Sequence, residues 1–295
     1  MSLSGVLTTF SCGSYTYPIF TSGDLTAERA VVFIGGLTNG IGAVPFTYPL
    51  EGALKAAGWK FIQFHWSSAY DGYGTGSLDR DRAEMQILVK HLKTTGLKTI
   101  VIMGHSTGSQ NVIHYLSSPD NNKNECHVEG GIMQAPVSDR EYCSDYKHYL
   151  DYLPVAEQWI REGKGNQILP DEFCKTAGFD DVEMKMTAYR LWSLIGKGGD
   201  DDYFSADIPV DPTPPFVHSL STSFGALTAP VLALYAEKDA KHQVAPPEKR
   251  LAEWEKAARG KLDWKILKGA SHDVSEEEPQ KALNREVLFW LKRFE

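Results

Sequence analysis

Residues 99–108 constrain the fold of this chain more than any other stretch. A short β-branched, apolar run from Thr99 to Met103 predicts a buried strand. Gly104-His-Ser-Thr-Gly108 follows at once and matches the G-x-S-x-G motif, and residues 110–116 then predict a helix. A strand, a sharp turn and a helix in this order are typical of a nucleophile elbow, whose strained turn projects the serine hydroxyl above the edge of the sheet.

The two glycines of this motif have a physical reason. A side chain at Gly104 or Gly108 would collide with the neighbouring strand or helix, and glycine removes that collision. The helix that starts after Ser106 directs backbone N–H groups toward the point where negative charge would develop. A glycine-rich loop leading into a helix could carry the same letters, but the flanking strand and helix favour the catalytic interpretation.

Length and composition restrict the class of protein. The length of 295 residues favours one α/β domain with an insertion, and the hydrophobic content of 42% supports a substantial core. No apolar run is long enough to span a membrane, and the first residues lack the features of a signal peptide, so we expect a cytoplasmic protein. The net charge of −8 argues against nucleic acid and anionic membranes as partners. No obligate protein partner is indicated.

The four cysteines give no sign of a metal or disulfide framework. Cys12, Cys126, Cys143 and Cys174 show no C-x-x-C spacing. We therefore expect each of them to be a reduced thiol packed inside the protein.

Strands and helices alternate along most of the chain, which predicts a mostly parallel, doubly wound sheet. The first two expected strands form an opening hairpin, and residues 67–77 are expected to be a loop. Strands are expected at 4–10, 15–21, 30–34, 60–66, 99–103, 130–135, 230–235 and 262–267, and helices at 45–58, 79–92, 110–116 and 280–294.

Residues 138–228 interrupt this alternation, and we expect them to form a helical lid inserted into a core domain of residues 1–137 and 229–295. Two helices are expected in the insertion, at 144–162 and 181–195. The insertion contains 16 acidic and 8 basic residues, so it carries the whole net charge of the chain. It also contains nine notable aromatic residues: Tyr142, Tyr146, Tyr149, Tyr152, Trp159, Tyr189, Trp192, Tyr203 and Phe204.

Two interpretations of this insertion remain open. An acidic mouth lined by aromatic side chains would favour bulky substrates that are neutral or cationic. A soluble helical surface, whose aromatic side chains pack into a small core of their own, would have the same composition.

A serine nucleophile needs a base within hydrogen-bond reach, and the base needs an orienting carboxylate. His272 follows a late strand and precedes the last helix, where the chain order Ser, Asp, His places the base. His65, at the end of a strand, is the weaker alternative. His105 lies inside the motif and should point away from Ser106.

Asp239 is the predicted acid, because it follows the strand at 230–235 and lies between nucleophile and base in the chain. Glu237 follows the same strand and could replace it by position. Asp139 is the main alternative, since it follows the preceding strand, where some hydrolases place the acid. Asp273 is too close to His272 in sequence to orient it easily.

The loop after the strand at 30–34 is the predicted source of one oxyanion-hole N–H, and the residue after the nucleophile supplies the other. Leu37 and Thr107 hold these positions. Gly36 is the alternative to Leu37, because the His-Gly dipeptide often found in this loop is absent. A plain tight turn is the other interpretation of residues 35–40.

Four segments make the chain resemble a narrower group of α/β-hydrolases. They are Phe33–Gly40, Gly104–Gln110, Gln134–Arg140 and Tyr203–Asp207. In these segments the chain resembles a fungal hydrolase family that includes the siderophore esterases of filamentous fungi. The resemblance implies a cytosolic enzyme that cleaves the ester bonds of fusarinine-type hydroxamate siderophores after uptake, so that iron can be released. It also implies Ser106, Asp239 and His272 as the catalytic triad.

The predicted reaction is hydrolysis of a small-molecule ester through an acyl-enzyme, with no cofactor and no metal site in the protein. Any iron would belong to the substrate. One alternative is a hydrolase of another bulky ester, a thioester, an amide or a lipid. The other is a non-catalytic ligand-binding module on a hydrolase scaffold.

Overall fold

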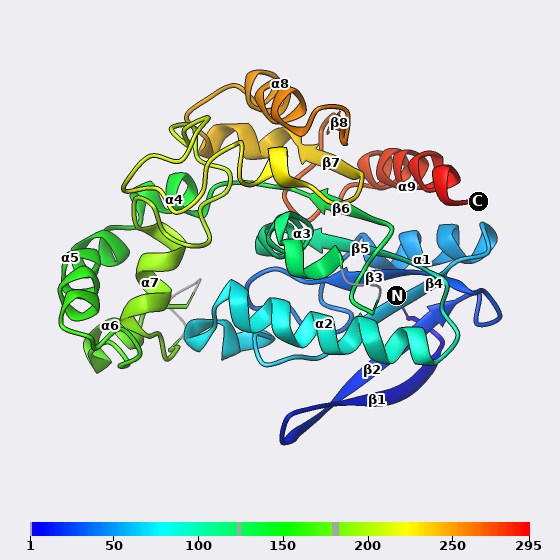
Figure 1. Ribbon diagram of the computed structural model, residues 1–295, viewed down its shortest axis with the longest axis horizontal. Coiled ribbons are helices and arrows are strands. Elements are labelled where there is room, and N and C mark those ends of the chain that lie inside the picture. Colours follow the sequence, from blue (N-terminus) through cyan, green and yellow to red (C-terminus); the bar gives the residue numbers. More distant parts are fainter. Residues whose placement is uncertain (1, 123–124, 179–182) are drawn as a thin grey trace.

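The computed structural model describes residues 2–122, 125–178 and 183–295, and an eight-stranded sheet forms its centre (Figure 1). The strand order is β1-β2-β4-β3-β5-β6-β7-β8. The strands are β1 (Val6–Cys12), β2 (Tyr15–Gly23), β3 (Arg29–Ile34), β4 (Lys60–Phe64), β5 (Thr99–His105), β6 (Gly130–Gln134), β7 (Val231–Ala236) and β8 (Leu262–Leu267).

Strand pairing agrees with the alternation of the sequence. β1 and β2 form the expected antiparallel hairpin, and β2 is also antiparallel to β4. All pairs from β4 through β3, β5, β6 and β7 to β8 are parallel. The predicted doubly wound, mostly parallel sheet is therefore confirmed.

Helices cover both faces of the sheet. The helices are α1 (Thr47–Ala56), α2 (Leu78–Thr94), α3 (Thr107–Ser117), α4 (Asp139–Tyr142), α5 (Lys147–Arg161), α6 (Asp171–Cys174), α7 (Ala188–Ile195), α8 (Pro247–Ala258) and α9 (Glu277–Leu291). α1 and α9 pack on one face, and α2, α3 and α8 pack on the other. None of the described helices is both long and apolar enough to cross a bilayer.

Strand β3 shows how one strand serves both cores. Val31 and Phe33 join the cluster under α1 and α9, whereas Val32 and Ile34 join the cluster under α2, α3 and α8. Successive side chains of a strand point to opposite faces, so a strand that is covered on both sides must be apolar throughout. This explains the uninterrupted apolar runs from which the strands were predicted.

Helix boundaries differ from the predicted ones where a side chain caps a helix or the chain tightens. The Thr187 side chain accepts a hydrogen bond from the Arg190 N–H, so α7 begins at Ala188 and not at 181. Residues 183–187 are not helical, and 181–182 lie outside the described residues. The predicted loop at 67–77 contains a 3₁₀ helix at Tyr70–Thr75.

The interval 138–228 has two differently packed parts. α4 to α7 surround a hydrophobic cluster that is separate from the two clusters on the sheet and that Tyr73 also joins. α5, α6 and α7 lie together at one end of the molecule (Figure 1). Tyr203 and Phe204 instead belong to the main core, where Phe204 packs against Trp254 of α8 with ring centroids 5.2 Å apart. Of the two interpretations of the aromatic residues, the one in which they line the mouth of a site does not hold for Tyr203 and Phe204, because both are buried in the main core.

Buried charged groups join the start of this insertion to its end. Glu141 accepts a hydrogen bond from the Ala206 N–H and pairs with Arg250 at 3.4 Å. Arg140 pairs with Asp202 at 2.8 Å. We call these five residues the insertion clamp. Breaking a buried ion pair leaves an uncompensated charge that costs about 3–5 kcal/mol, so the clamp fixes where the insertion leaves and rejoins the core.

Candidate active site

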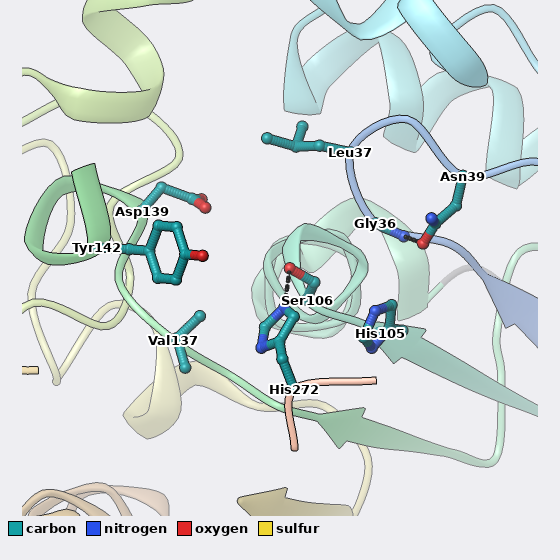
Figure 2. A pocket seen from close by; sticks show the side chains of 9 residues that line it. All are labelled: Gly36, Leu37, Asn39, His105, Ser106, Val137, Asp139, Tyr142 and His272. Carbon is teal, nitrogen blue, oxygen red and sulfur yellow. Dashed lines mark hydrogen bonds between the residues drawn. The ribbon is translucent and has the colours of Figure 1, made fainter. Parts of the chain in front are cut away.

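Ser106 occupies a strained turn between the central strand β5 and helix α3. Its φ is +55° and its ψ is −124°, a backbone conformation that non-glycine residues rarely adopt and that costs on the order of 1–3 kcal/mol. Its N–H donates to the Gln134 carbonyl of the neighbouring strand at 3.0 Å. The turn therefore holds the Ser106 hydroxyl in the pocket at the end of the sheet (Figure 2).

Glycines surround this serine because the backbone approaches too closely for a side chain. A Cβ on Gly104 would lie 2.0 Å from the Gly108 oxygen, and one on Gly108 would lie 2.4 Å from the Ile34 oxygen. A Cβ on Gly36 would lie 2.8 Å from the Ser106 Cβ. The predicted collisions at both motif glycines are confirmed, and the loop after β3 packs directly against Ser106.

Two hydrogen bonds connect Ser106 with His272 and Asp239. His272 Nε2 lies 2.8 Å from Ser106 Oγ, and His272 Nδ1 lies 2.9 Å from Asp239 Oδ2. Asp239 follows β7 and His272 follows β8, and these parallel neighbours end at the same edge of the sheet as β5. The structure brings together the three residues that the chain order selected.

Opposing effects act on the pKa of His272. Burial lowers it, but the hydrogen bond and the charge of Asp239 raise it, and the charge of Asp139 adds to the increase. The net effect is a pKa above the ordinary value of 6.5. His272 is therefore a stronger base than a free imidazole.

The other candidates for the base and the acid are engaged elsewhere. Glu237 is only partly buried and pairs with Lys268 at 2.9 Å. The ring of His65 packs against Tyr17, with centroids 5.9 Å apart. Asp273 accepts a hydrogen bond from the hydroxyl of Ser271. None of the three makes a hydrogen bond to His272 within the described part of the chain.

Gln134 is a site residue that sequence reasoning missed. Its Oε1 binds Nδ1 of the buried His105, and its Nε2 donates to the His272 carbonyl at 3.2 Å. Burial, followed by the charge of His272, lowers the pKa of His105 to about 3, so this imidazole is neutral and its Nδ1–H is the donor. Figure 2 shows the His105 ring beside His272 and away from the Ser106 hydroxyl, as expected. The one signal in the sequence was the amide side chain of Gln134 near the end of an otherwise apolar predicted strand.

The loop after β3 distinguishes the two candidate oxyanion donors. The Gly36 N–H already donates to the Asn39 side chain at 2.9 Å. The Leu37 N–H has no partner among the described residues, and the Leu37 side chain packs against the cluster formed by the insertion. Thr107 is the first residue of α3, so its N–H has no carbonyl to reach within the helix. This geometry favours Leu37 over Gly36 as the donor from the loop, and it leaves the Thr107 N–H available as the second donor.

A pocket opens above Ser106, and residues from the sheet and from the insertion line it (Figure 2). The lining residues are Gly36, Leu37, Asn39, His105, Ser106, Val137, Asp139, Tyr142 and His272. Asp139 does not hydrogen-bond to His272; its Oδ2 accepts a hydrogen bond from Gln110 Nε2 at 2.6 Å instead. Tyr142 alone of the nine aromatic residues noted in the insertion lines this pocket within the described chain.

The described ranges contain no group of three or more His, Cys, Asp or Glu side chains placed to hold a metal ion. All four cysteines are unpaired, and Cys126, Cys143 and Cys174 are buried.

A serine on the sharp turn after the central parallel strand, in a doubly wound sheet covered on both faces, defines an α/β-hydrolase. The chain belongs to the family described as proteins of unknown function DUF1749, whose model matches residues 1–292.

The proteins similar to this chain include two curated relatives and one solved structure whose names refer to ester or siderophore hydrolysis. Esterase AN6793 of Emericella nidulans is 38% identical over 227 residues, covering 61% of this chain and 60% of that protein. Fusarinine C esterase sidJ of Aspergillus fumigatus is 34% identical over 170 residues, covering 50% of this chain and 44% of that protein. This chain thus spans less than two thirds of the length of either relative.

The structure titled siderophore hydrolase EstB from Aspergillus fumigatus has a TM-score of 0.80 and 25% identity, covering 99% of this chain and 98% of that one. These comparisons confirm the resemblance to siderophore esterases that the four sequence segments indicated.

Proposed function

We propose that this protein is a serine ester hydrolase in which Ser106 is the nucleophile, His272 the base and Asp239 the orienting acid. The observation that carries the proposal is the pair of hydrogen bonds, 2.8 Å and 2.9 Å long, that leads from the strained serine through the imidazole to a buried carboxylate. A nucleophile, a base and an orienting group within hydrogen-bond reach are the arrangement that acyl transfer requires.

In the first half of the reaction, Ser106 Oγ attacks the ester carbonyl while His272 Nε2 accepts the hydroxyl proton. Asp239 holds the Nδ1–H tautomer and stabilises the imidazolium that forms. The N–H groups of Leu37 and Thr107 donate to the developing oxyanion, and one such donor is worth roughly 10²–10³ in kcat. Collapse of the intermediate breaks the bond to the leaving alkoxide, which takes the proton from His272.

In the second half, His272 removes a proton from water, and the resulting hydroxide attacks the acyl-enzyme. Collapse of this second intermediate releases the carboxylic acid and returns the proton to Ser106 Oγ. Over the two halves, one ester and one water are consumed, and one carboxylic acid and one alcohol are formed.

The proposed substrates are the ester bonds of fusarinine-type hydroxamate siderophores, with iron release in the cytoplasm as the setting. The names of the relatives, a fusarinine C esterase and a siderophore hydrolase, support this choice. We further propose that α4 to α7 act as the lid of the pocket. Tyr142 and the packing of Leu37 against the insertion cluster support that role.

A fluorophosphonate probe and an ester panel test the proposal. The probe should label the wild-type protein and an exposed-serine control, Ser144→Ala, but not Ser106→Ala. Undiminished labelling or turnover in Ser106→Ala would contradict the mechanism. Hydrolysis of simple acyl esters without cleavage of hydroxamate siderophore esters would retain the hydrolase and refute the substrate.

A further inference from the structure

Asp139 is a carboxylate of the pocket that has no basic partner. Gln110 donates to its Oδ2 at 2.6 Å, and within the described chain Asp139 takes part in no ion pair. Arg190, a cation whose charge acts on it, is committed to Asp201 at 2.7 Å. The two histidines that line the same pocket do not bind it, so the charge of Asp139 is not neutralised by contact with a protein cation.

The surroundings of Asp139 disfavour its ionised form when no ligand is bound. Burial, followed by the charge of Asp201, raises the pKa of Asp139 to about 7, although Arg190 and His272 act in the opposite direction. A poorly solvated carboxylate without a cation is a strong binding group for a ligand that brings the opposite charge. Asp139 therefore has the electrostatic character of a recognition group.

Tyr142 adds an aromatic ring beside this carboxylate, and its hydroxyl points into the pocket toward Ser106 (Figure 2). The ring also packs against His242, with centroids 4.5 Å apart. Asp139 and Tyr142 are three residues apart in α4, a spacing that places both side chains on one face of a helix. Figure 2 shows them together on one wall, across the pocket from Gly36 and Asn39, with Ser106 between the two walls. A carboxylate next to an aromatic ring is a favourable environment for an ammonium group.

We propose that Asp139 and Tyr142 form a subsite for a primary alkylammonium group of the substrate, in the pocket that contains Ser106. This inference rests on the proposed ester hydrolase function and adds a substrate class to it. A carboxylate on the substrate would be repelled here, and an uncharged amide would leave Asp139 without a counter-charge. An ester that carries a free amine should therefore be preferred over the same ester with that amine acetylated.

Nitrophenyl esters of ω-amino acids of increasing chain length, each paired with its N-acetyl derivative, test this preference. At the chain length that reaches the subsite, the wild-type kcat/KM should be higher for the free amine, mainly through a lower KM. Asp139→Asn should reduce the ratio of the two kcat/KM values about 10- to 100-fold, the range expected for one charge-assisted hydrogen bond. Equal rates for both members of every wild-type pair would overturn the proposal.

Matched variants separate the subsite from the general acidity of the insertion. Asp145→Asn removes the same charge from an exposed position of the insertion and should leave the ratio unchanged. Tyr142→Leu should lower the ratio a few-fold, and Tyr142→Phe, which keeps the ring, should retain most of it. If Asp139→Asn does not fold, the comparison of Tyr142→Leu with Tyr142→Phe tests the proposal instead. A preference that survives both Asp139→Asn and Tyr142→Leu would refute the assignment.

Calorimetry on Ser106→Ala makes the result independent of catalysis. This variant should bind the uncleaved amino ester more tightly than its N-acetyl partner, and the difference should disappear in the double variant with Asp139→Asn. Failure of the proposed hydrolysis would abolish turnover of both esters in the wild type without changing this binding difference. Equal binding of both esters to Ser106→Ala would refute the subsite alone.

Discussion

Replacing Gly36 by alanine adds one methyl group against the nucleophile without removing any reacting atom. The added Cβ would lie 2.8 Å from the Ser106 Cβ, 3.1 Å from the His105 oxygen and 3.4 Å from Ser106 Oγ. The first of these contacts is tighter than packed atoms tolerate, so the loop or the serine must shift by roughly half an ångström or more. Because the loop also supplies the proposed Leu37 donor, either shift changes the geometry at the reacting carbonyl.

The expected change in the free energy of unfolding follows from two opposing effects, and the expected change in kcat follows from the displaced geometry. Overpacking costs about 1–3 kcal/mol of unfolding free energy. Gly36 does not have a positive φ, so alanine also recovers about 0.4–1 kcal/mol through the unfolded chain. A misplacement of about 1 Å can cost 10²-fold in rate, and we therefore expect kcat to fall about 10- to 100-fold while the protein stays folded.

Steady-state kinetics on a nitrophenyl ester, together with thermal unfolding, measure both effects. Gly52→Ala is the matched control, because Gly52 lies in α1 and no atom would approach its added Cβ within 4 Å. That control should keep the wild-type kcat and gain up to about 1 kcal/mol of stability. A Gly36→Ala variant with wild-type kcat would refute the inference that the loop after β3 fixes the position of Ser106.

Two further predictions concern the base and the acid. His272→Ala and Asp239→Asn should each lower kcat about 10³–10⁴-fold by analogy with other triads. The control Glu237→Gln, at a partly exposed position on the same loop, should remain close to wild type. A larger loss in Glu237→Gln than in Asp239→Asn would reverse the assignment of the acid. The reaction needs neutral His272, whose pKa is raised, so kcat/KM should increase with pH through a midpoint above 6.5 and then level off. A pH–rate profile that is flat from pH 5 to 8 would show that this imidazole is not the base.

The sheet could be predicted from sequence because its strands carry local information. A strand buried on both faces is apolar throughout, and the connecting helices show a single apolar face. The central motif was equally informative, because close backbone contacts at Gly104 and Gly108 exclude every other residue. Chain order then sufficed to select Asp239 and His272, which the structure brings together.

The remaining features of the site depend on contacts between distant segments. Whether Gly36 or Leu37 is free to donate depends on where the Asn39 side chain points, and spacing does not specify that. Composition alone did not separate Tyr203, which is buried in the main core, from Tyr142, which lines the pocket. The position of Asp139 in the pocket wall was equally hidden, because the order of residues suited a triad acid as well as a recognition group.

The insertion clamp separates the outer helices of the insertion from the residues that line the pocket. Glu141, Arg250, Arg140 and Asp202 fix the points where the chain leaves and rejoins the sheet layer, whatever sequence lies between. Most of the hydrophobic cluster around α5 to α7 comes from the insertion itself, and Tyr73 and Leu37 are its contacts from the core domain. Residues of α5 to α7 that do not contact these two can therefore diverge without repacking the strands that present Ser106 and His272. A chimera that keeps the clamp and replaces residues 147–201, so that the buried Arg190–Asp201 pair is exchanged as a unit, should therefore fold. It should also keep the substrate preference of the parent, because Asp139 and Tyr142 lie outside the exchanged segment.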